Sequence, residues 1–88
     1  MDNDEDKMMF DYADKFINLA NEMSKSDRSG NVGVAIRYAA ARYSAFEASM
    51  RTNNLAEEKD TQQELFGNEF SRMLQINIED YAKRQSHN

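Results

Sequence analysis

The stretch NVGVAIRYAAARYSAFEASM, residues 31–50, decides the fold that we predict for this chain of 88 residues. Its alanines favour one long helix, and apolar residues occupy most of the circumference of that helix. One apolar face holds Val32, Ala35, Ile36, Ala39, Tyr43, Phe46 and Met50, and a second holds Val34, Tyr38, Ala41, Ala45 and Ala48. The strip that we expect to face solvent consists of Arg37, Ser44, Glu47 and Arg51. A helix that is apolar on nearly all sides is usually buried, so we predict a central helix with neighbours on two faces.

The segments on either side have the spacing of apolar residues that such neighbours require. Between residues 8 and 24, one face holds Met9, Tyr12, Ala13, Phe16, Leu19, Ala20 and Met23, with Phe10 and Ile17 at its edge. Between residues 54 and 83, one face holds Leu55, Phe66, Phe70, Met73, Leu74 and Tyr81, with Ile78 at its margin. The sequence leaves open whether this third helix is continuous, because Gly67 weakens its middle and Asn77 is able to cap a separate final turn.

Short polar connections join the three predicted helices. Residues 24–30, SKSDRSG, show no periodicity and end in glycine. Either Ser29 or Asn31 is the expected N-cap of the second helix. Asn54 stands three residues before Glu57, which is the spacing of a capping box at the start of the third helix.

These elements predict an all-α fold: a three-helix antiparallel bundle with the second helix central and helices at about 8–24, 31–52 and 54–83. The chain has no proline, and no segment alternates apolar and polar residues as a half-buried strand does. Every phenylalanine falls on or beside an inward face: Phe10, Phe16, Phe46, Phe66 and Phe70. We expect a single domain at residues 8–83, an acidic, disordered N-terminus at 1–7 and a disordered tail at 84–88.

Composition narrows the location and the partners. The chain has no cysteine, which fits a reducing compartment, and no run near the roughly 18 apolar residues that span a membrane. We therefore expect a cytoplasmic protein that does not associate with a membrane. The net charge of −5 opposes binding to the phosphates of nucleic acid.

The residue types that most catalysis and metal binding require are scarce. The only histidine is His87, in the polar tail, and the Glu-x-x-His pairs of helical metal sites are absent. The acidic cluster at residues 2–6 lacks the turn glycine and the distal glutamate of a calcium loop. No glycine-rich phosphate loop is present. We predict no metal, no cofactor and no enzymatic activity.

One residue breaks the apolar pattern of the second helix. By its angle, Arg42 lies within the apolar arc, where an unpaired charge is costly. We predict that Arg42 contacts Glu69 on the third helix, with Asp14 on the first helix as the second candidate. The pair is either a structural ion pair that fixes the helix register or part of a small anion-binding notch that Tyr38 and Ser49 also line.

A second irregularity is an apolar pair on the third helix. Leu65 and Ile76 fall together on the side away from the predicted core, with Arg72 between them. Single exposed apolar residues are common, so the pair either has no function or lines an interface with another copy or with a partner helix.

Three segments resemble a known family. They are FDYADKFINLANE at residues 10–22, VAIRYAAARYSAF at 34–46 and EFSRMLQINIEDY at 69–81. They are similar to a family of short, acidic, uncharacterised proteobacterial proteins classed as a domain of unknown function. The similarity covers about residues 8–81, and YAAAR with the aromatic residue that follows it is its most specific part. Phenylalanine is common in the family where this chain has Tyr43. The resemblance implies a bacterial source and, since the family has no established activity, no functional residue.

The expected function is that of a small, non-catalytic helical protein-interaction module, which binds another protein or associates with a second copy. The alternative is a regulatory or nucleic-acid-binding module that uses Arg37, Arg42 and Arg51 together with Tyr38, because arginine and aromatic side chains hold phosphates and stack on bases. The acidic net charge weighs against this alternative.

Overall fold

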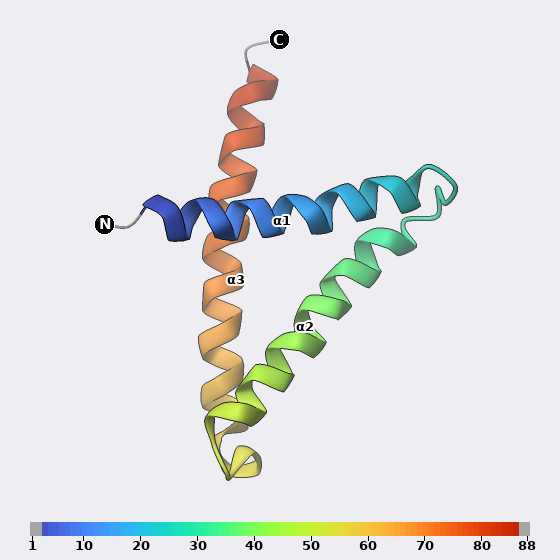
Figure 1. Ribbon diagram of the computed structural model, residues 1–88. Helices are drawn as coiled ribbons and strands as arrows, with labels where there is room; N and C mark the ends of the chain where they lie inside the picture. The colour runs from blue at the N-terminus through green and yellow to red at the C-terminus, as the bar shows by residue number, and fades with distance from the viewer. Residues whose placement is uncertain (1–2, 87–88) are drawn as a thin grey trace. The chain divides into compact units, whose positions relative to one another are not determined.

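The computed structural model describes residues 3–86, and three helices make up most of them (Figure 1). Helix α1 spans Asn3–Ser24, α2 spans Asn31–Arg51 and α3 spans Leu55–Ser86. No strand occurs within residues 3–86. The predicted all-α class and the three helices in this order are confirmed.

The helices form two compact units that share α2. The N-terminal unit holds α1 and the part of α2 up to Tyr43, and the C-terminal unit holds α2 from Ser44 onward and α3. Helix α2 therefore contacts α1 in one unit and α3 in the other, as we predict for the second helix of a three-helix bundle.

Helix α1 begins earlier than the sequence suggests. It starts at Asn3 instead of residue 8, so that Asp4, Glu5 and Asp6 form its first turn. Acidic side chains stabilise this end of a helix because the unpaired backbone N–H groups there carry partial positive charge. The expectation of disorder is therefore wrong for residues 3–7, and residues 1–2 lie outside the described part of the chain.

Helix α3 is one continuous helix of 32 residues that passes through both Gly67 and Asn77. The Asn77 side chain donates a hydrogen bond of 2.8 Å to the carbonyl of Met73 in the preceding turn, instead of capping a new one. The helix reaches Ser86, so the expected disorder of the tail is wrong for residues 84–86. His87 and Asn88 lie outside the described residues.

The connection between α1 and α2 is closed by local hydrogen bonds. Gly30 adopts a φ of 92°, a left-handed conformation that glycine adopts without steric cost, and its carbonyl accepts from Val34 N–H at 3.4 Å. The carboxylate of Asp27 accepts from the hydroxyl of Ser29 at 2.6 Å and from its backbone N–H at 2.9 Å. These two hydrogen bonds, the hydroxyl one first, hold the pKa of Asp27 below its ordinary value. Gly30 therefore occupies the N-cap position of α2, and the prediction of Ser29 or Asn31 at this position is wrong by one residue.

Residues 52–54 connect α2 to α3 in the C-terminal unit. The carbonyl of Asn54 accepts from the N–H groups of Glu57 and Glu58, both at 3.2 Å, so Asn54 occupies the predicted cap position. The predicted capping box pairs Asn54 with Glu57, but the side-chain hydrogen bond at this helix start involves Thr52 and Glu58. The hydroxyl of Thr52 donates to the carboxylate of Glu58 at 2.8 Å. The Thr52 oxygen also accepts from Asn54 N–H at 3.0 Å.

In the C-terminal unit, α2 and α3 meet along a strip of small and polar residues. Ala48 is 4% exposed and is the only buried residue among residues 4–86. The half-buried residues of this unit are Ser44, Glu47, Thr52, Leu55, Gln62 and Phe66. The guanidinium carbon of Arg51 lies 4.9 Å from the centroid of the Phe66 ring, in a cation–π contact between the two helices.

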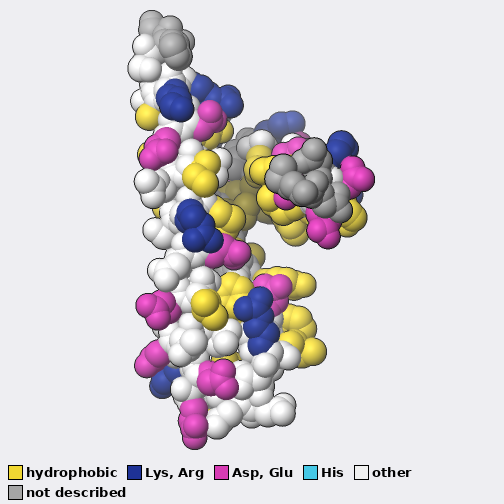
Figure 2. Space-filling view, turned by 90° about the vertical axis from the view of Figure 1, so that its left-hand side faces the viewer, with side chains coloured by type: hydrophobic (Ala, Val, Ile, Leu, Met, Phe, Trp, Pro, Cys, Tyr) yellow, Lys and Arg dark blue, Asp and Glu magenta, His cyan; other side chains and the backbone are white. Residues whose placement is uncertain are grey.

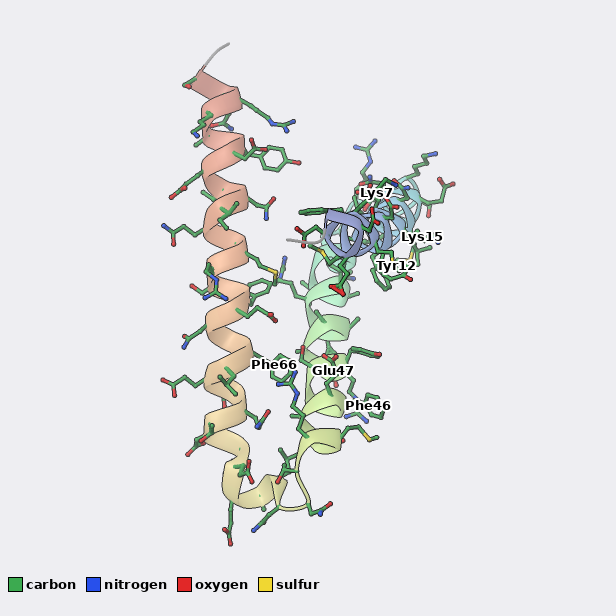
Figure 3. The ribbon with its side chains drawn as sticks, turned by 60° about the vertical axis from the view of Figure 1, so that its left-hand side comes forward. Lys7, Tyr12, Lys15, Phe46, Glu47 and Phe66 are labelled. Carbon is green, nitrogen blue, oxygen red and sulfur yellow. The ribbon has the colours of Figure 1, made fainter. Side chains whose placement is uncertain are left out.

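The predicted orientation of α2 is therefore wrong in this unit. Ser44, Glu47 and Arg51, which we expect to face solvent, lie on the side that meets α3. Figure 3 shows Phe66 pointing from α3 toward α2, whereas Phe46 points away from α3. A small residue such as Ala48 lets two helix backbones approach closely, and the aliphatic stems of its polar neighbours cover the contact.

Candidate interaction surface

Large apolar side chains remain open in both units. Among the described residues, 21 large hydrophobic side chains are between 38% and 74% exposed. Figure 2 shows hydrophobic side chains at the surface beside acidic and basic ones. The phenylalanines that the sequence assigns to the core but the structure leaves exposed are Phe10, Phe16, Phe46 and Phe70. Exposed apolar surface on this scale is characteristic of a surface that binds a partner.

The most regular apolar surface runs along α1. It consists of Met9, Tyr12, Phe16, Leu19 and Met23, which we name the α1 seam. Successive members stand three and four residues apart in alternation, which is the a/d spacing of a coiled coil. Their side chains are between 45% and 66% exposed, whereas Ala13 and Ala20 beside them are half-buried. The most covered side of α1 is therefore lined by small residues, and its large residues are left open.

Charged side chains of α1 interact with neighbours within the same helix. The ammonium of Lys7 lies 3.2 Å from the Asp11 carboxylate one turn later. The ammonium of Lys15 lies 5.9 Å from the centroid of the Tyr12 ring, and Figure 3 shows both side chains on the same helix. Exposed contacts of these kinds contribute about 0–1 kcal/mol each, so they orient side chains more than they stabilise the fold.

The three helices differ in charge. Helix α1 has six acidic and two basic residues, and α3 has seven acidic and four basic residues. Helix α2 has one acidic residue, Glu47, and three basic ones, Arg37, Arg42 and Arg51. These three arginines are the ones assigned to the alternative nucleic-acid-binding function, and they make α2 the only one of the three helices with an excess of positive charge. Arg51 also lies over the ring of Phe66.

The residues of the predicted anion-binding notch are divided between the two units. Arg42 and Tyr38 belong to the N-terminal unit, and Glu69 and Ser49 belong to the C-terminal unit, so the Arg42–Glu69 contact stays a prediction. The ion pair is predicted because Arg42 is expected to be buried, where an unpaired charge is costly. In the structure Arg42 is exposed. The hydroxyl of Ser49 donates to the Phe46 carbonyl at 2.6 Å within α2.

The predicted outer pair of α3 is exposed. Leu65 and Ile76 are 54% and 61% exposed, and Arg72 is exposed as well. Phe70 and Met73, which we assign to the inward face, are exposed to a similar degree. Exposure therefore does not single out the pair, and its role as an interface stays a prediction.

One polar group of the C-terminal unit is buried without a partner. Oε1 of Gln62 is covered, accepts no hydrogen bond and belongs to the stretch of α3 that faces α2. Leaving a buried acceptor unpaired costs about 1–3 kcal/mol. Sequence reasoning gave no signal for this position, because glutamine on a helix is usually solvated.

Residues 3–86 contain no group of three or more histidine, cysteine, aspartate or glutamate side chains placed to hold a metal ion. None of the helices in that range is both long enough and apolar enough to cross a membrane.

The fold and its surfaces define a small all-α domain of three helices with open apolar faces. The match of its sequence to a known family is extensive. The chain belongs to the family described as "Protein of unknown function (DUF3144)", which it matches over residues 9–82. The resemblance to a domain of unknown function is thereby confirmed. No curated protein and no solved structure matches the chain.

Proposed function

We propose that this protein is a small, non-catalytic interaction module whose exposed apolar helix faces bind another protein chain. The observation that supports this most is the contrast in burial: 21 large apolar side chains are exposed among the described residues, while one alanine is buried. Burying apolar surface by binding a partner contributes a favourable free energy of about 25 cal/mol for each Å² removed from water.

The pattern of exposure supports binding by helix faces in particular. The exposed residues of α1 recur at the spacing of a helical seam, and a groove or a second helix recognises such a seam through residues one turn apart. We further propose a cytoplasmic location, which the absence of cysteine from the sequence supports.

The proposal is tested by capture of the tagged chain from its native host, with charge-adding variants in parallel. We expect a protein to be retained by the wild-type chain and to be lost with Phe16→Glu on the α1 seam. Asn18→Glu adds the same charge two residues away, outside the seam, and should retain the partner. If no protein is retained, a second copy of the chain included, the proposal is wrong.

A nucleic-acid-binding function through Arg37, Arg42, Arg51 and Tyr38 is the second candidate. The observation that favours it is that α2 carries three basic residues and one acidic residue, with Tyr38 60% exposed beside them. A mobility-shift assay decides between the candidates, since phosphate contacts weaken steeply with salt. An absence of binding to RNA and DNA at low salt removes this candidate.

A further inference from the structure

We draw no further inference here: the strongest candidate, the exposed apolar patch that the α1 seam forms along the first helix, carries none because nothing in the structure shows what covers it.

Discussion

Replacing Ala48 with leucine tests the contact between α2 and α3 at its most buried point. Ala48 is 4% exposed, and the side chains one turn before and after it, Ser44 and Thr52, are half-buried. Three additional carbons at this position have no free space, so the helices must separate or the side chain must adopt a strained rotamer. Overpacking of this kind costs about 1–3 kcal/mol of the free energy of unfolding. For a chain of this length, each kcal/mol lowers the melting temperature by about 4–8 °C.

The matched control for this prediction is Ala45→Leu, on the same helix. Ala45 is exposed, and alanine and leucine have similar helix propensities, so we expect a change within about 0.5 kcal/mol. Urea unfolding, followed by circular dichroism at 222 nm, gives the free energy of unfolding for both variants. If Ala48→Leu destabilises the chain no more than Ala45→Leu does, then α2 does not meet α3 through Ala48, and the orientation predicted from the sequence regains support.

Three further predictions follow from local features of the structure. Gly67→Ala should raise the free energy of unfolding by about 0.5–1 kcal/mol, because position 67 is helical and a Cβ there meets no atom within 4 Å. Gly30→Ala should lower the free energy of unfolding, because Gly30 has a φ of 92°, which alanine adopts only with strain. The lowered pKa of Asp27 makes its hydrogen bonds a source of stability that is fully present above its ordinary value of 3.8 and is lost as pH falls through the folded-state pKa. The difference in stability between the wild-type chain and Asp27→Asn should therefore shrink below about pH 4, and an unchanged difference down to pH 2 contradicts this. Gln62→Met should raise the free energy of unfolding by about 1–3 kcal/mol, because it removes a buried acceptor that has no partner. In urea unfolding, an increase in the m-value without an increase in the midpoint concentration contradicts this prediction.

The sequence predicts the helices well because their signals are local. The apolar period in residues 8–24, the glycine at position 30 and the Asn54–Glu57 spacing each depend on a few neighbouring residues. The ends of α1 and α3 are harder to place. At the end of α3, residues that favour a helix continue past the last apolar one. At the start of α1, the acidic first turn stabilises the helix without a capping residue that would mark its beginning. The predicted starts and ends therefore miss the true ones by several residues at Asn3 and Ser86.

The orientation of α2 is not predictable from its sequence for a physical reason. A helix that is apolar on nearly all sides has a weak hydrophobic direction, so many rotations bury similar amounts of apolar surface. The contact with α3 is then decided by how closely the backbones approach, which favours the alanine side over the side that carries Phe46 and Met50. Those two side chains stay exposed, at 53% and 74%. For the same reason, the burial assigned to Arg42 from its angle in the apolar arc is wrong: the arc itself is open.

A hydrophobic pattern shows that a face is to be covered, but it does not show which chain covers it. The face of α1 that the sequence assigns to an internal core contains both Ala13 and Ala20, which are half-buried, and the α1 seam, which is exposed. One helical neighbour covers only part of so wide a face, since the contact between two helices is a narrow stripe. The small residues allow one close contact, and the coiled-coil spacing of the seam provides for a second. If another protein chain makes the second contact, as the proposed interaction function requires, the residues that the sequence assigns to an internal core are buried in a complex instead of in the single chain.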